Sequence, residues 1–203
     1  MSLFRRSSNG GGEPGRWIII GLGNPGPRYE DTRHNVGVRV IERLLDDAGA
    51  SLKSHKSGCL VAEVGTGDGR MVLARSTGYM NETGRPLGLL MRWYKVGVDR
   101  LIVVHDELDI PFGDVRVKAG GGTAGHNGLR SVGSHLGTKE FLRVRIGISR
   151  PVGRLDPADY VLQSFSGAER KELPEIVDRA AEAVESIVSK GPERAMNEVN
   201  TRA

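Results

Sequence analysis

Trp17-Ile-Ile-Ile-Gly-Leu22 is the stretch that decides the fold of this 203-residue chain. The run is apolar and mostly β-branched, no polar residue interrupts it, and a glycine closes it. Such a run is typical of a strand that is buried on both faces, with helices packed above and below it. The segment therefore predicts the interior of an α/β sheet.

The segments on either side alternate between strand and helix patterns. Further strands are predicted over residues 60–64, 71–74, 101–104, 115–118 and 141–149. Helices are predicted from Thr32 to Gly49, over 81–94 and 127–136, and from Pro157 onward, including the amphipathic stretch 168–190. The glycine-rich turn at 65–69 joins two of the strands as a hairpin, which adds an antiparallel pair. We therefore predict one α/β domain, with a mixed, twisted sheet flanked by helices.

Composition limits the class of protein. Hydrophobic residues make up 38% and charged residues 27% of the chain, which suits a folded globular domain. Cys59 is the single cysteine, and no apolar run reaches the roughly 18 residues of a membrane span. We expect a cytoplasmic protein that is neither secreted, membrane-bound nor rich in disulfides. Residues 1–15 are polar and glycine-rich, and we expect a disordered N-terminal extension before a single folded domain over 16–203.

Positive charge gathers in the second third of the chain. Residues 112–150 hold seven basic and two acidic residues, whereas the whole chain has 29 basic and 25 acidic ones. By the two-residue period of a strand, Arg116 shares a face with Lys118, and Arg143 shares a face with Arg145. A polyanionic partner, first of all a nucleic acid, is one interpretation; a solvated basic face is the other.

The glycines after the first strand admit two interpretations. Gly21-Leu-Gly-Asn-Pro-Gly26 matches the G-x-G-x-x-G pattern of dinucleotide-binding folds. That fingerprint needs a helix that starts within the glycines, but Pro25 and Pro27 favour an extended turn and the helix begins only near Thr32. The loop instead presents Asn24 at the carboxyl end of a strand, where open α/β sheets place ligands.

Polar residues recur at the other strand–helix junctions. They are Asn24, His34 with Asn35, Tyr79 to Asn81, His105 to Asp109, and His126 with Asn127. Each alone could be a helix cap or a solvated side chain, but together they can converge on one rim of the sheet. His34 falls in the first turn of a predicted helix, where the helix dipole disfavours an imidazolium, so we expect a neutral ring.

At these junctions the sequence resembles the bacterial-type peptidyl-tRNA hydrolases, over residues 16–200. The resemblance rests on G-L-G-N-P-G-x-x-Y-x-x-T-R-H-N-x-G at 21–37, Y-M-N at 79–81, H-D-E-L-D at 105–109, G-G-G-x-x-G-H-N-G-L at 120–129 and R-V-R-I-G-I at 143–148. The five ordered motifs are jointly specific. Two departures stand out: Gly78 replaces a frequent hydroxyl residue, and Thr123-Ala124 replaces a more glycine-like pair.

The resemblance implies a monomeric, metal-independent esterase that frees tRNA from peptidyl-tRNA. It implies that His34 is the catalytic base and that Asp106 orients it. It also assigns Asn24, Asn81 and Asn127 to substrate binding, and Lys118 and Arg145 to phosphate binding. We add Tyr29 and Tyr79, which lie in the same motifs, as candidates for substrate binding, and Arg116 and Arg143, which share strand faces with Lys118 and Arg145, as candidates for tRNA binding. No cofactor is implied.

The residue types suit hydrolysis of an ester by water. A neutral histidine can take a proton from water, and a carboxylate on its other nitrogen fixes the tautomer. Covalent catalysis is disfavoured, since there is no G-x-S-x-G motif and Cys59 lies in an apolar strand pattern. A metal at His105, Asp106, Glu107 and Asp109 is a weaker alternative, because alternation along a strand would separate Asp106 from its neighbours. A non-catalytic RNA-binding relative on the same fold is the rival function.

Overall fold

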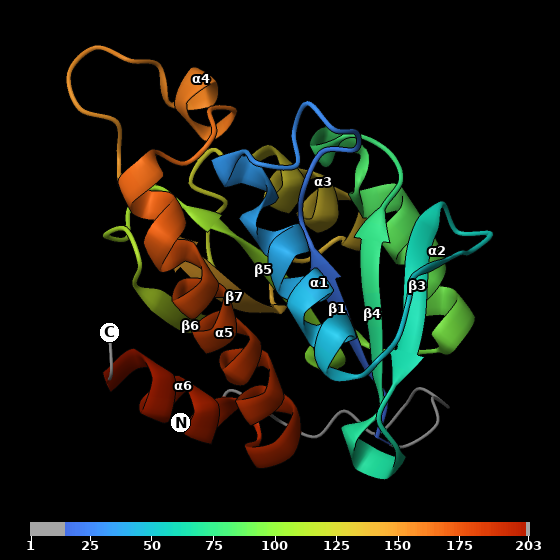
Figure 1. Ribbon diagram of the computed structural model, residues 1–203. Coiled ribbons are helices and arrows are strands. Elements are labelled where there is room, and N and C mark those ends of the chain that lie inside the picture. The colour runs from blue at the N-terminus through green and yellow to red at the C-terminus, as the bar shows by residue number, and fades with distance from the viewer. Residues whose placement is uncertain (1–14, 202–203) are drawn as a thin grey trace.

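The fold is that of a mixed seven-stranded sheet with helices on both faces (Figure 1). The computed structural model describes residues 15–201, so the expected N-terminal extension lies outside the described residues apart from Gly15. The strands are β1 (Trp17–Gly21), β2 (Lys53–Ser54), β3 (Cys59–Val64), β4 (Met71–Ser76), β5 (Leu101–Glu107), β6 (Val115–Ala119) and β7 (Leu142–Gly147). Their order in the sheet is β2-β3-β4-β1-β5-β7-β6, which confirms the predicted fold class.

The first predicted strand lies at the centre of the sheet. β1 pairs in parallel with β4 on one side and with β5 on the other, and β5 pairs in parallel with β7. The antiparallel pairs are β2 with β3, β3 with β4, and β6 with β7. The carboxyl ends of β1, β4, β5 and β7 therefore meet at one edge, where open α/β sheets bind their ligands.

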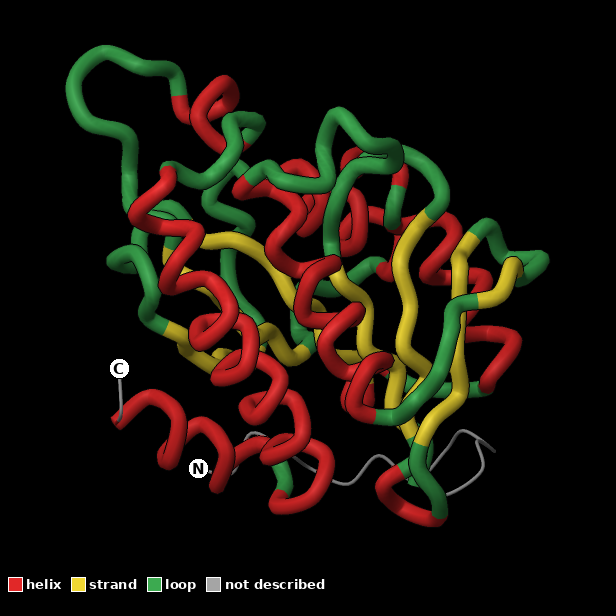
Figure 2. Tube along the Cα trace, in the orientation of Figure 1, coloured by secondary structure: helices red, strands yellow, loops and turns green. Residues whose placement is uncertain are grey.

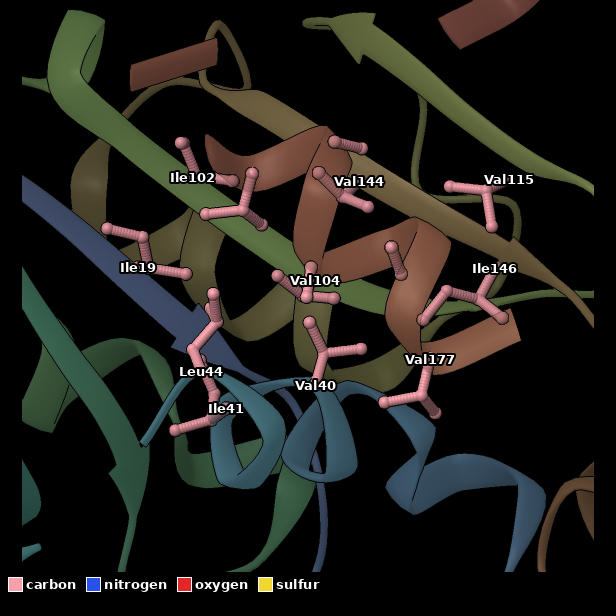
Figure 3. Close-up of a cluster of buried hydrophobic side chains, with 14 of the residues drawn as sticks. Ile19, Val40, Ile41, Leu44, Ile102, Val104, Val115, Val144, Ile146 and Val177 are labelled. Carbon is pink, nitrogen blue, oxygen red and sulfur yellow. The ribbon is translucent and has the colours of Figure 1, made fainter. Parts of the chain in front are cut away.

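Two hydrophobic clusters cover the two faces of the sheet. Ile19 points into the cluster shared with α1 (Val36–Asp47), α5 (Gly167–Lys190) and α6 (Pro192–Thr201) (Figure 3). Ile18 and Ile20 point into the other cluster, beneath α2 (Gly84–Tyr94) and α3 (Asn127–Leu136). All three isoleucines are fully buried, as expected for a strand with helices on both sides.

Figure 2 shows a long loop between β7 and the short helix α4 (Pro157–Val161) projecting beyond the sheet. Within residues 15–201, no helix is long and apolar enough to cross a membrane. Cys59 is a free, buried thiol, as predicted, and burial raises its pKa to about 11. Such a thiol is a poor nucleophile.

Several predicted boundaries are wrong at the ends of elements. The helix expected from Thr32 begins with a 3₁₀ turn, Arg33–Asn35, and only then continues as α1. The helix expected from residue 81 likewise begins with a 3₁₀ turn, Met80–Glu82, before α2. β5 extends to Glu107, because pairing with β7 continues past the apolar run, so His105 and Asp106 lie within the strand. The two-residue β2 was not predicted; both of its residues are exposed and polar, so no apolar pattern marks it.

α1 contacts the sheet through two glycines. A Cβ on Gly21 would lie 2.3 Å from the carbonyl oxygen of Gly37, and a Cβ on Gly37 would lie 2.3 Å from that of Val104. No side chain fits either space, so the amino end of α1 rests directly on the backbones of β1 and β5. This contact fixes the position of the turn that carries His34.

Lys95 ends α2 in the left-handed conformation, with φ of +53°. Replacing it by glycine removes a steric cost of about 1–2 kcal/mol and adds a smaller entropic one, so we expect Lys95→Gly to raise the free energy of unfolding by about 0.5–1 kcal/mol. Urea denaturation measures this change. Lys95→Ala is the matched control, because alanine keeps the steric cost; equal stability of the two variants would contradict the prediction.

Candidate active site

His34 and Asp106 meet at the carboxyl edge of the sheet. Nδ1 of His34 lies 2.9 and 3.0 Å from Oδ1 and Oδ2 of Asp106. Both side chains are buried, with 7% and 3% of their residues' surface exposed. Because a carboxylate only accepts, His34 must carry its proton on Nδ1, which leaves Nε2 as the nitrogen able to take another proton.

His126, which the predicted site did not include, binds the same carboxylate. Its Nε2 lies 3.1 Å from Oδ1 of Asp106, while its Nδ1 accepts the backbone N–H groups of Gly128 and Leu129 at the start of α3. The accepting Nδ1 fixes the tautomer, so Nε2–H donates to Asp106. The sequence placed His126 among the polar residues of the strand–helix junctions but gave it no role, because imidazole is not among the usual N-cap side chains; its place directly before a predicted helix was the available signal.

Asp106 therefore accepts from two imidazoles in a buried site. Burial alone would favour the protonated acid, but the two histidines outweigh it and hold the pKa of Asp106 well below its usual range. For His34, burial acts to lower the pKa, and the Asp106 carboxylate outweighs burial, so that the pKa is raised. The expectation that the helix dipole keeps His34 from charging is wrong in sign: one buried carboxylate at hydrogen-bond distance exceeds a partial charge at a helix terminus.

His105 is buried beside the site, and among residues 15–201 it belongs to no group of possible metal ligands with its strand neighbours. Its Nδ1 donates to the backbone carbonyl of Asp106 at 2.6 Å, and burial lowers its pKa to about 3. Asp109 instead pairs with Arg150 at 2.6 Å. His34, Asp106 and His126 bring three possible ligand atoms within 4.8 Å of one another, but N–H···O hydrogen bonds already join these atoms.

A cavity of about 260 Å³ opens beside this group. Its walls come from the turn before α1, from the end of β5, from the loop before α3 and from α4. The lining residues are His34, Asp106, Glu107, Leu108, Ala124, Gly125, His126, Asn127, Asp156, Pro157, Ala158 and Val161. Segments far apart in the sequence thus enclose one space against the His34–Asp106 pair.

Arg33 fixes the His34 turn to the far side of the cavity. Its buried guanidinium donates to the carbonyl of Ser164 at 2.8 Å and to the carboxylate of Glu169 at 2.7 Å. It also lies over the ring of Tyr160, at 4.3 Å. This cluster ties the His34 turn to α4 and to the start of α5, two elements that follow more than a hundred residues later.

Asn24 joins two of the predicted motifs. Oδ1 of Asn24 accepts a hydrogen bond from the backbone N–H of Met80 at 2.9 Å. The side chain of Asn35 accepts from the backbone N–H of Asn24 at 2.8 Å and donates to the backbone C=O of Asn24 at 2.9 Å. With Oδ1 engaged, the side chain of Asn24 has its NH₂ group left to donate.

The other predicted substrate residues are more exposed. Asn81 is exposed, and Asn127 is exposed with its Oδ1 accepting from Arg130. The rings of Tyr29 and Tyr79 meet edge to face, with centroids 6.4 Å apart, and Tyr79 is 55% exposed. The backbone contact between Met80 and Asn24 holds the Tyr79–Asn81 turn beside the first motif.

The predicted basic face is only partly exposed. Lys118 is exposed, and Arg116 and Arg145 are half-buried on the neighbouring strands β6 and β7. Arg143 lies on the same face of the sheet as Arg145, as predicted, since it pairs with Lys118 where Arg145 pairs with Arg116, but it is only 2% exposed. Its guanidinium donates to the carbonyls of Gly122 at 2.5 Å and Gly121 at 2.6 Å, because the glycine loop folds over this end of β7.

Comparison with known proteins agrees with this geometry. The family model described as peptidyl-tRNA hydrolase matches residues 18–203. The chain belongs to the peptidyl-tRNA hydrolase family. It is 52% identical to the peptidyl-tRNA hydrolase of Frankia alni, over 91% of this chain and 94% of that one. The hydrolase of Frankia casuarinae is 54% identical, over 90% of this chain and 93% of that one. The crystal structure of the Acinetobacter baumannii enzyme superposes with a TM-score of 0.85 at 33% identity, over 94% and 97% of the two chains.

One of the departures from the peptidyl-tRNA hydrolase family pattern lies in the wall of the cavity. Ala124 lines the cavity with φ of +45°, a conformation that glycine adopts at much lower cost. Gly78 precedes the turn that carries Tyr79, and Ser76 Oγ accepts its N–H at 3.1 Å. Neither departure changes a group that contacts Asp106.

The pKa of His34 can be measured directly. In NMR titrations we expect its imidazole to titrate above 6.5, and Asp106→Asn to lower that pKa, because an amide removes the negative charge that stabilises the imidazolium. His105 is the internal control: its pKa lies near 3, so it should not titrate in the range of about pH 5 to 8 where an unperturbed histidine does. An unchanged His34 pKa in Asp106→Asn would contradict the electrostatic assignment.

Proposed function

We propose that this chain hydrolyses the ester that joins a peptide to tRNA, with His34 as the general base acting on water. The observation that carries the proposal is the pair of contacts from His34 Nδ1 to both oxygens of Asp106, at 2.9 and 3.0 Å. These contacts leave Nε2 free of Asp106 on a histidine that lines the cavity. Membership of the peptidyl-tRNA hydrolase family supports the same reaction.

The reaction follows from this arrangement. Nε2 of His34 takes a proton from water as the water oxygen attacks the ester carbonyl carbon. The imidazolium that forms keeps its Nδ1–H on Asp106, whose charge stabilises it. Collapse of the tetrahedral intermediate breaks the bond between carbonyl carbon and ribose oxygen, and His34 returns the proton to that oxygen. The products are a free peptide carboxylate and tRNA with its terminal hydroxyl restored.

The amide side chains suit a substrate whose peptide varies. The NH₂ group of Asn24, held by the engaged Oδ1, is a donor for the carbonyl oxygen on which negative charge develops. Asn81 and Asn127 offer donors and acceptors to the peptide backbone, and Tyr29 and Tyr79 offer ring surface. Because these groups recognise features that every peptide shares, they do not require one side chain.

His126 acts through Asp106. Its Nε2–H holds Oδ1 of the carboxylate, and its Nδ1 fixes the ring to the first backbone N–H groups of α3. The loop that carries Asn127 is thereby linked to the orientation of the base. We assign His126 a positioning role in place of direct contact with the reacting atoms.

On strands β6 and β7, Lys118, Arg116 and Arg145 supply positive charge for phosphates near the tRNA acceptor end. Burial lowers the pKa of Arg145, and Arg116 beside it acts in the same direction, so an approaching phosphate would relieve repulsion between these cations. We propose that the protein acts as a monomer in the cytoplasm, where peptidyl-tRNA arises. A non-catalytic RNA-binding role is disfavoured, because such a role does not require a buried base–carboxylate pair.

His34→Ala tests the assignment of the base. We expect kcat to fall by about 10²–10⁴-fold, the usual contribution of a general base, with tRNA binding nearly unchanged. Single-turnover release of tRNA from an N-acyl-aminoacyl-tRNA gives the rate, and filter binding gives the affinity. If hydrolysis persists at more than a few per cent of the wild-type rate, another group is the base.

Removal of metal ions tests the rival chemistry. The three possible ligand atoms at Asp106 are joined by hydrogen bonds, so we expect full activity after dialysis against EDTA. Activity that disappears with EDTA and returns with Zn²⁺ would make His34, Asp106 and His126 metal ligands and would replace the mechanism above.

Lys118→Ala and Arg145→Ala test the tRNA side. Each substitution should raise KM with little change in kcat. Each should also reduce the slope of the log of the tRNA binding constant against log salt concentration, by about 0.7–0.9 for each phosphate that the variant no longer binds. Both variants should cleave a minimal ester, which carries only the terminal adenosine, as fast as the wild type does.

Arg143→Ala is the matched contrast. Its guanidinium holds the loop carbonyls of Gly121 and Gly122, so its loss should impair both the tRNA substrate and the minimal ester. If Lys118→Ala and Arg145→Ala also impair the minimal ester, they belong to the catalytic centre or to the fold and not to a phosphate site.

A further inference from the structure

The outer face of α2 carries exposed cations and apolar side chains. Arg85, Leu89, Arg92 and Trp93 follow the spacing of one helix face, and all four are exposed. Leu89 is 37% exposed and Trp93 is 54% exposed, whereas Leu87, Leu90 and Met91 on the other side of α2 are buried in the core. Leu89 and Trp93 therefore take no part in the packing of α2 against the hydrophobic core.

The β2–β3 hairpin adds two lysines to this surface. Nζ of Lys56 lies 3.5 Å from the centre of the Trp93 ring, and the ring of His55 meets Trp93 edge to face at 5.6 Å. Lys53 is exposed on β2, next to this turn. We call the surface formed by Lys53, Lys56, Arg85, Leu89, Arg92 and Trp93 the α2 face.

The α2 face is rich in positive charge. Residues 51–62 and 83–98, which form it, contain no aspartate or glutamate; Glu63, Glu82 and Asp99 border these ranges, and Glu63 accepts a hydrogen bond from the Tyr94 hydroxyl of α2. Among the residues that the structure describes, no carboxylate forms an ion pair with its four cations. On α1, by contrast, Arg39 pairs with Asp31 and Arg43 with Asp178. Four unpaired cations around an exposed indole match the requirements of a nucleic-acid strand, whose phosphates need charge and whose bases stack on aromatic rings.

We propose that the α2 face binds single-stranded RNA, and that this RNA is distinct from the tRNA whose ester is cleaved. The proposal that the α2 face binds RNA rests on the residues of that face alone. The proposal that this RNA is not the substrate tRNA rests on the proposed function, in which β6 and β7 bind the substrate tRNA. In the sheet order, β3 lies five strands from β6, which is about 24 Å at the usual strand spacing. The proposed phosphate contacts on β6 and β7 therefore lie across the central strand β1 from β3, against which α2 packs.

Trp93 provides a direct probe. The chain has two tryptophans, and Trp17 is 7% exposed, so quenching by an added nucleic acid reports on Trp93. We expect a 15-nucleotide oligouridylate to quench the fluorescence of the full chain, with affinity that falls as salt rises. Trp93→Phe should lose the signal and keep binding in fluorescence anisotropy with labelled oligouridylate.

Side-chain truncation tests the contacts. Trp93→Ala and the double variant Lys56→Ala/Arg92→Ala should each weaken oligouridylate binding about tenfold or more, as removal of a stacking platform or of phosphate-binding charge does. Lys171→Ala, an exposed cation on α5, is the matched control and should bind as the wild type does. All these residues are exposed, and thermal melts check that each variant is folded.

Two substrates separate the outcomes. We expect Trp93→Ala to keep the wild-type kcat/KM on peptidyl-tRNA; an equal loss there would place the α2 face in the substrate site and overturn the second RNA. Equal quenching by polyglutamate would indicate an acidic protein partner, and no quenching by oligouridylate would indicate a solvated surface; either result overturns the proposal. If oligouridylate binds but the chain hydrolyses no peptidyl-tRNA, the proposed function fails and the RNA surface stands.

Discussion

Contact between backbones, made possible by two glycines, is the constraint on which the rest of the structure depends. Gly21 ends β1 and Gly37 is the second residue of α1, and any Cβ at either position would lie 2.3 Å from a carbonyl oxygen. Because the helix rests on the backbones of β1 and β5, the turn just before it stands at the edge of β5. His34 lies in that turn and Asp106 lies on β5, so the packing of glycine against the sheet sets the distance between them.

Asp106 then organises the polar part of the site. A carboxylate buried without partners would be protonated, and two imidazole N–H groups keep it charged. One of these groups comes from the turn before α1 and the other from the start of α3, so a single carboxylate connects both ends of the site. The same charge raises the pKa of His34, which strengthens the base but lowers its neutral fraction at low pH.

The outer parts of the chain hold the walls of the site. Arg33 ties the His34 turn to Glu169, and Arg143 holds the glycine loop by its carbonyls. At the sheet edge, the Asn200 side chain accepts from the N–H and donates to the C=O of Val117, at 2.8 and 2.9 Å. The Asn200 side chain thus forms, with the backbone of Val117, the two hydrogen bonds that a neighbouring strand would form. It covers part of the edge of β6, which would otherwise be open to pairing with another strand.

The sequence by itself determined the α/β class, the central strand, the helix over 127–136 and the junctions at which the polar residues cluster, because apolar periodicity and turn residues are local signals. It also singled out His34, Asp106 and Asn24, whose contacts the structure displays. Only the tertiary structure decided which groups share Asp106, the direction of the His34 pKa shift and the burial of Arg143. These depend on distances between segments that are tens of residues apart. Electrostatic energies and solvent exposure follow those distances, and residue spacing along the chain does not contain them.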